Sequence, residues 1–149
     1  MNLLVSACLL GVNCRYDGGC RTDRTVTRLA GRFGLVPVCP EQMGGLPTPR
    51  PPVELCEGRA VTRQGLDVTD RFLRGAQETL KLARLCGCRY AVLKSKSPSC
   101  GCGLRYDGTF SGGLTSGDGL TAELLRRSGI VVLHENEAEA ELRRLFPDG

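Results

Sequence analysis

Short apolar runs recur along the chain, and stretches with helical spacing separate them. The runs at 3–7, 35–38, 90–93 and 130–133 are rich in Leu, Val, Ala and Ile, and each is four or five residues long. Runs of this kind are typical of strands that are buried on both faces, as in parallel sheets. We therefore expect four main strands.

Helical patterns lie between and after these runs. We expect helices over residues 25–33, from a cap at Thr69 to Leu85, from a cap at Asp118 to Arg127, and beyond a cap at Asn136. Strands that alternate with helices imply crossover connections and a parallel sheet covered on both faces. The pattern predicts an α/β fold: one small Rossmann-like three-layer domain over 1–149, with a mainly parallel sheet of about four strands plus short hairpins at 53–62 and 105–117.

Two stretches lack any apolar period. Residues 39–52 are dense in Gly and Pro, which predicts a long, stiff loop without regular structure. Residues 94–103 follow the third strand and carry hydroxyls, lysines and thiols on a Gly- and Pro-containing loop. Long ordered loops in small domains are usually functional, and loops at strand ends are where open α/β sheets bind ligands.

The charge and the cysteine content of the chain argue against several classes of protein. The net charge of +4 is mild and the charges are interspersed, which favours a mixed solvated surface and disfavours a nucleic-acid partner. Nine cysteines are the unusual feature. Their number is odd, and the start of the chain lacks the basic leader of an export signal, so a secreted disulfide scaffold is not expected. No run is long enough to cross a membrane. We expect a cytoplasmic protein with reduced thiols.

Three of the cysteines follow predicted strands directly. Cys8 lies just after the first strand, Cys39 just after the second, and Cys100 on the loop after the third. Because the carboxyl ends of parallel strands meet at one edge of a sheet, these three thiols are expected to converge there. Chance placement is the alternative, since nine cysteines are distributed over the chain.

Other cysteines compete for the same edge. Cys14 and Cys20 share the first loop and stay in reserve, and Cys102 competes with Cys100. A structural zinc site wants four ligands at compact spacings such as C-x2-C, which are absent here, and the single histidine, His134, ends the last strand. Three thiols suit an iron–sulfur cluster better. Such a cluster is normally held by four cysteines, so with three of them one iron would stay open for a substrate.

Polar residues beside these thiols have two interpretations each. Glu41, close to the second thiol, suits a general acid or base, or an ion pair with Arg50. Ser97 suits a hydrogen bond to sulfur or substrate, or a turn within its loop. Lys94 and Lys96 suit an anion site or plain solvation.

Three motifs together resemble a known family. They are Ser-Ala-Cys-Leu-Leu-Gly at 6–11 with Cys-Arg-Tyr-Asp-Gly at 14–18, Cys-Pro-Glu at 39–41 with Gly-Gly-Leu-Pro-Thr-Pro-Arg at 44–50, and Ser-Pro-Ser-Cys-Gly at 97–101. In this order, and along nearly the whole chain, they resemble the TudS-like thiouracil desulfurases.

The resemblance implies a [4Fe-4S] cluster held by Cys8, Cys39 and Cys100. It also implies a non-redox desulfuration of a small thiolated pyrimidine, a 2-thiouracil-like base or its nucleotide, to the oxo base with release of hydrosulfide. The open iron would bind the substrate sulfur, and Glu41 and Ser97 would assist water attack and proton transfer.

Two other hypotheses remain at this point. One is a non-catalytic iron–sulfur or zinc-binding module, or a sulfur carrier linked to tRNA thiolation. The other is a plain cysteine enzyme in which Lys96 activates Cys100 as a nucleophile. The sequence leaves the oligomeric state open.

Overall fold

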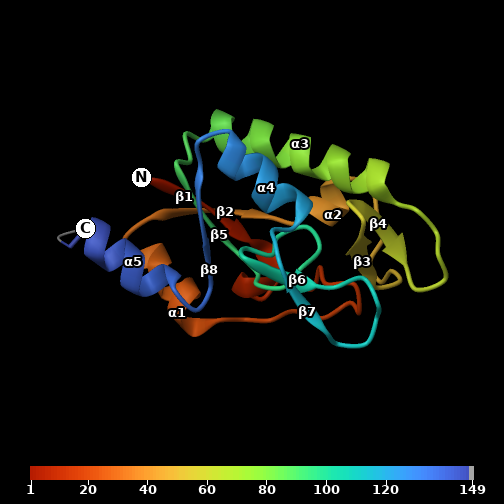
Figure 1. Cartoon of the computed structure of the whole chain (residues 1–149). Coiled ribbons are helices and arrows are strands. Elements are labelled where there is room, and N and C mark those ends of the chain that lie inside the picture. The colour runs from red at the N-terminus through yellow and green to blue at the C-terminus, as the bar shows by residue number, and fades with distance from the viewer. Residues whose placement is uncertain (148–149) are drawn as a thin grey trace.

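A four-stranded parallel sheet forms the centre of the protein in the computed structural model, which describes residues 1–147 (Figure 1). Its strands lie in the order β2-β1-β5-β8, and every pairing is parallel. Their bounds are β1 (Asn2–Ser6), β2 (Gly34–Val38), β5 (Tyr90–Leu93) and β8 (Val131–His134). The predicted α/β fold with four parallel strands is confirmed. Pro37 lies in the edge strand β2, where a missing N–H is tolerated.

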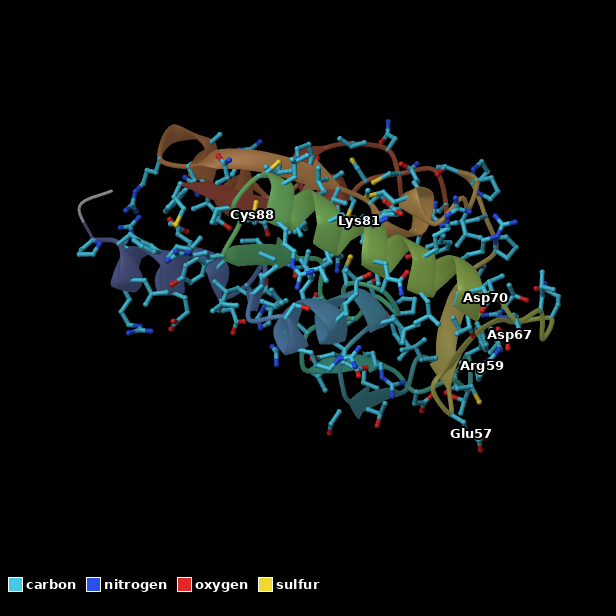
Figure 2. The ribbon with its side chains drawn as sticks, turned by 90° about the horizontal axis from the view of Figure 1, so that it is seen from above. Glu57, Arg59, Asp67, Asp70, Lys81 and Cys88 are labelled. Carbon is cyan, nitrogen blue, oxygen red and sulfur yellow. The ribbon has the colours of Figure 1, made fainter. Side chains whose placement is uncertain are left out.

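Helices cover both faces of the sheet. The long helix α3 (Thr69–Leu85) and α4 (Leu120–Arg127) lie together over one face, and α1 (Arg24–Thr27) and α5 (Ala138–Leu145) lie on the other. Figure 2 views the first face, with Asp70 near the start of α3 and Lys81 towards its end. The structure therefore has the three layers that the alternating pattern predicted.

Side chains of each strand alternate between two cores. Leu4 of β1 packs in the core beneath α3 and α4, with Leu80 and Leu125. Its neighbour Val5 packs in the opposite core, with Leu142 of α5. Because successive strand residues point to opposite faces, an uninterrupted apolar run is what a doubly covered strand requires.

Several predicted helices and loops differ from those observed. The predicted helix at 25–33 is only four residues of α-helix, after which the chain tightens into the 3-10 helix η2 (Arg28–Gly31). A further 3-10 helix, η1 (Ala7–Leu10), follows β1 directly. The stretch 39–52 is not wholly irregular, because it contains the helical turn α2 (Pro40–Met43). Proline is acceptable there because the first helical residue needs no backbone donor.

The three predicted caps are wrong. Thr69 is inside α3, and its Oγ1 accepts the backbone N–H of Ala60 at 2.9 Å. The carboxylate of Asp118 accepts the N–H of Gly103 at 2.8 Å instead of a helical N–H, and the last helix starts later than a cap at Asn136 would require. In each helix the cap position belongs to a residue without a capping side-chain bond: Val68, Gly119 and Glu137. For Thr69 and Asp118, the side-chain oxygen that a cap would use is bound by a backbone N–H from another part of the fold.

Two antiparallel hairpins complete the fold, as predicted. The first pairs β3 (Val53–Cys56) with β4 (Arg59–Thr62), and the second pairs β6 (Leu104–Tyr106) with β7 (Leu114–Ser116). Within residues 1–147, none of the helices has the length and apolar character needed to cross a membrane.

Candidate functional site

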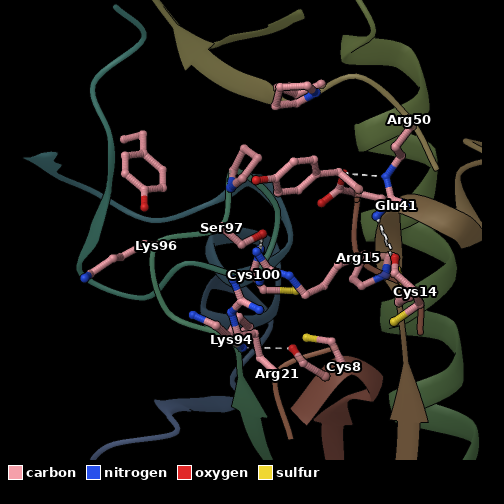
Figure 3. A pocket seen from close by; sticks show the side chains of 18 of the residues that line it. Cys8, Cys14, Arg15, Arg21, Glu41, Arg50, Lys94, Lys96, Ser97 and Cys100 are labelled. Carbon is pink, nitrogen blue, oxygen red and sulfur yellow. Dashed lines mark hydrogen bonds and ion pairs between the residues drawn. The ribbon is translucent and has the colours of Figure 1, made fainter. Parts of the chain in front are cut away.

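The carboxyl ends of the strands open into a cavity of about 420 Å³ (Figure 3). Ser6 at the end of β1, Val38 at the end of β2 and Lys94 just after β5 contribute to its wall. The two hairpins close its other side, through residues that include Val53 and Tyr106. This is the edge at which open parallel sheets bind ligands.

Four thiols line this cavity. The three that sequence analysis placed at strand ends, Cys8, Cys39 and Cys100, are all present. Cys14, which was held in reserve, also lines it and is 2% exposed. Figure 3 shows Cys8, Cys14 and Cys100 around the cavity. The parallel topology thus places three thiols that are far apart in the sequence around one cavity.

Local structure presents each of these thiols. Cys8 is the second residue of η1, whose tight turn is closed by Gly11 at φ 93°. Cys39 occupies the N-cap position of α2 in extended conformation. Cys100 lies in the loop after β5, which turns so closely at Gly101 that a Cβ there would collide with backbone atoms of Ser97. A tight turn follows each strand, so each thiol stays at the sheet edge.

The other two competing cysteines lie elsewhere. The thiol of Cys102 is buried away from the cavity, where it donates to the carbonyl of Val132 at 3.5 Å and accepts from Arg126 at 2.6 Å. Cys20 contacts Thr22 at 3.5 Å in a solvent-exposed hydrogen bond and is not among the residues that line the cavity.

The pKa is raised for three of the cavity thiols, those of Cys14, Cys39 and Cys100. Desolvation raises the pKa of Cys100 to about 12. The contact with Cys14, together with burial, raises the pKa of Cys39. Cys14 contacts two thiols: Cys39 lowers its pKa, whereas Cys8 and burial raise it, and the pKa ends above its usual value. Thiolates would need a bound cation to become stable here, because a coordinated metal deprotonates a thiol outright.

The donor set fits an iron–sulfur cluster better than a single ion. In the described part of the chain, no three His, Cys, Asp or Glu side chains converge closely enough to hold one metal ion. A cubane presents its irons at separate corners, so its thiolates need not meet at a point. His134 lies outside the cavity beside Glu137, at 3.4 Å, so the cavity offers only sulfur as a soft donor.

Glu41 contributes a carboxylate to the cavity wall and forms an ion pair there. Its side chain lines the cavity and is 15% exposed, and its Oε1 accepts a hydrogen bond from Arg50 Nε at 3.1 Å. The predicted ion pair with Arg50 is therefore present, and it holds the carboxylate at the cavity wall next to Cys39. A carboxylate in this position is able to exchange protons with a ligand in the cavity.

Serine hydroxyls organise the loop that carries Cys100. Ser97 Oγ accepts the backbone N–H groups of Ser99 at 3.1 Å and Cys100 at 3.0 Å, which is the turn-stabilising role expected of it. Sequence analysis missed Ser6, whose Oγ accepts the N–H of Lys94 at 2.9 Å at the cavity wall. A lone hydroxyl at the end of an apolar strand was the available signal.

The cavity wall carries an excess of positive charge. Lys94 is compensated by the buried Glu135, 3.2 Å away, whereas Lys96 is exposed and adopts φ 67°, which is strained for a residue with a side chain. Sequence analysis also missed three arginines that line the cavity: Arg15, Arg21 and Arg63. The combination favours anionic or electron-rich ligands.

Comparisons with known proteins agree with these features. The sequence matches the 2-thiouracil desulfurase family over residues 3–137. It is 41% identical over 145 residues to the uncharacterized protein YbbK of Bacillus subtilis (strain 168), covering 91% of this chain and 96% of that protein. A solved structure of the [4Fe-4S]-dependent thiouracil desulfidase TudS is 44% identical, with a TM-score of 0.92 over 98% of this chain and 97% of the other.

Proposed function

The chain belongs to the 2-thiouracil desulfurase family, and we propose that it forms one [4Fe-4S]-dependent desulfurase domain that acts on a thiolated pyrimidine. In the reaction, an oxygen of water forms a bond to the ring carbon, the carbon–sulfur bond breaks, and sulfur leaves as hydrosulfide. No electrons are gained or lost overall. The observation that carries the proposal is the cavity that thiols from three strand ends line together with a carboxylate.

Cys8, Cys39 and Cys100 are the residues we assign to the cluster, because each follows a different strand and reaches the cavity independently. When bound, the cluster supplies an open, Lewis-acidic iron for the substrate sulfur. The thiol of Cys14 interacts with those of Cys8 and Cys39, which shift its pKa, and we assign it no bond to iron.

Glu41 is the residue we assign to proton transfer. Arg50 binds its Oε1, and Oε2 is the oxygen that we expect to take a proton from the attacking water and return it to the ring or to the departing sulfur. The carboxylate is held on a helical turn, so its position does not depend on the substrate.

Ser97 is suited to donate a hydrogen bond. Its Oγ already accepts two backbone N–H groups, so its single O–H hydrogen is available for a sulfur or for the substrate. Lys96 and the arginines of the cavity wall would suit a phosphorylated form of the substrate, so both the base and its nucleotide belong to the proposal.

The test is Glu41→Gln, which keeps the side chain's size and removes its ability to carry a proton. We expect the variant to bind about as much iron as the unaltered protein and to release sulfide from 2-thiouracil about 100- to 10,000-fold more slowly. Glu78→Gln is the matched control, because Glu78 pairs with Lys81 on the exposed face of α3. Full activity in Glu41→Gln would remove Glu41 from the mechanism.

The same experiment separates the proposal from a non-catalytic iron–sulfur module or sulfur carrier. Such a protein would take up iron and release no sulfide from the thiolated base under any condition. A plain cysteine enzyme using Cys100 would be active without iron. Activity that depends on anaerobic reconstitution with iron and sulfide would exclude both.

A further inference from the structure

Arg50 is a buried cation with a complete set of partners. Its side chain is 3% exposed, although it comes from the Gly- and Pro-rich stretch between β2 and β3. A guanidinium has five N–H donors, and here each faces one acceptor. These are Glu41 Oε1 at 3.1 Å, the carbonyl of Pro47 at 3.2 Å, Thr48 Oγ1 at 2.9 Å, the carbonyl of Cys14 at 2.9 Å and Cys39 Sγ at 3.9 Å.

Two of these acceptors belong to the proposed chemistry. Nε of Arg50 binds the carboxylate of Glu41, and Nη2 of the same group contacts the sulfur of Cys39. The guanidinium is planar and rigid, so it fixes these two groups relative to each other. Figure 3 shows Arg50 and Glu41 joined at the cavity wall.

We propose that Arg50 is a positioning residue that couples Glu41 to the cluster, by holding the carboxylate and by donating an N–H···S contact to the Cys39 ligand. Hydrogen bonds to ligand sulfurs withdraw electron density and are one of the factors that set the reduction potential of an iron–sulfur cluster. The contact therefore favours an electron-poor iron, which binds substrate sulfur better. This inference rests on the proposed function.

A purely structural role would explain some of the same contacts. Three donors of Arg50 bind Pro47, Thr48 and the carbonyl of Cys14, and these bonds would tie the loops together even without a cluster. Such a role would affect folding or iron content. It would leave the potential of an intact cluster unchanged, so the potential is the decisive quantity.

The experiment compares Arg50→Lys with Arg71→Lys after anaerobic reconstitution. Arg71 of α3 also binds the Gly- and Pro-rich stretch, because its Nη1 donates to the carbonyl of Gly45 at 3.0 Å. This bond is exposed, and neither residue lines the cavity. We expect both variants to retain iron. The midpoint potential of the cluster should become more negative in Arg50→Lys, because an ammonium cannot contact Glu41 and Cys39 together, and should stay unchanged in Arg71→Lys.

A second measurement covers the case in which Arg50→Lys does not fold. In Glu41→Gln the charge of Arg50 loses the carboxylate with which it pairs, so the midpoint potential should move in the positive direction. An intact cluster at the original potential in Arg50→Lys, or in Glu41→Gln, would overturn the coupling, as would loss of iron from an Arg50→Lys protein that still folds. Failure of the unaltered protein to take up iron would instead overturn the proposed function.

Discussion

Ser6 Oγ accepts a hydrogen bond from the backbone N–H of Lys94 at 2.9 Å, across 88 positions of sequence. Ser6 ends β1 immediately before the turn that carries Cys8. Lys94 begins the loop that carries Cys100. This one bond therefore joins two of the three segments that present thiols to the cavity.

Ser6→Ala should destabilise the metal-free protein by about 1–3 kcal/mol, because the N–H of Lys94 would lose its partner in a partly buried position. Urea unfolding followed by circular dichroism measures this change. Ser128→Ala is the control, since Ser128 caps the end of α4 through Leu124 at 2.8 Å, far from the thiols. An equal loss of unfolding free energy in the two variants would mean that the Ser6 bond stabilises the protein no more than an ordinary hydrogen bond at the end of a helix.

Gly75→Ala should displace α2, which carries Glu41. A Cβ at Gly75 of α3 would collide with the carbonyl oxygen of Pro40, so the two helices would have to separate. We expect a loss of about 1–3 kcal/mol and a lowered iron content after reconstitution. Gly31→Ala is the matched control, because a Cβ there meets no atom within 4 Å. Unchanged stability in Gly75→Ala would show that the helices have room to adjust.

Serine substitution should identify the ligands. Cys8→Ser, Cys39→Ser and Cys100→Ser should each lose the cluster, whereas Cys102→Ser should keep it, because Cys102 faces Val132 and not the cavity. Iron quantitation and the visible absorbance of the reconstituted protein measure the outcome, with about four irons per chain expected for an intact cluster.

Cys14→Ser is the most informative variant of this set. Cys14 touches both Cys8 and Cys39, yet the proposal assigns it no bond to iron. We expect its serine variant to retain the cluster. If Cys14→Ser lost its iron and one of the variants Cys8→Ser, Cys39→Ser and Cys100→Ser kept it, Cys14 would be the ligand in place of the cysteine changed in that variant.

Alkylation of the metal-free protein should discriminate between Cys20 and Cys100. Hydrogen bonds from Thr22 lower the pKa of the half-buried Cys20 below the usual value of 9.0, whereas burial raises that of Cys100 to about 12. Only the thiolate reacts. With rising pH, iodoacetamide should therefore modify Cys20 first, and Cys100 should react only as the pH approaches about 12. Peptide mass spectrometry at several pH values reads out the order, and early modification of Cys100 would contradict its burial.

Asp67 should contribute to stability in acid. Its carboxylate accepts hydrogen bonds from the backbone N–H of Thr69 at 2.9 Å and from Arg59 Nε at 2.8 Å (Figure 2). These bonds lower the pKa of Asp67 from 3.8 to about 2. Because the folded pKa is the lower one, the stabilisation is present above pH 3.8 and is lost as the pH falls towards 2. Asp67→Asn should flatten the pH dependence of thermal unfolding in that window. An unchanged slope would show that other carboxylates dominate.

The topology was predictable because apolar runs and helical spacing report burial directly. Runs of four or five apolar residues are stable only when both faces are covered, so they predicted the parallel strands, and the strands placed Cys8, Cys39 and Cys100 at one edge. Local capping was less predictable. Asp118 accepts from Gly103, 15 residues away, and such competition between local and distant donors leaves no trace in a local sequence pattern.

The sequence by itself determined the three layers, the edge of the sheet at which the strands end, and the residue types that reach this edge. It did so because the period of apolar side chains and the order of the elements can both be read from the sequence. Only the tertiary structure decided which neighbours these residues have. Arg50 in a Gly- and Pro-rich stretch has the same sequence whether it is solvated or surrounded by five acceptors, and Cys14 becomes a cavity thiol only through the path of its loop. Contacts between distant loops depend on three-dimensional packing, which no local period encodes.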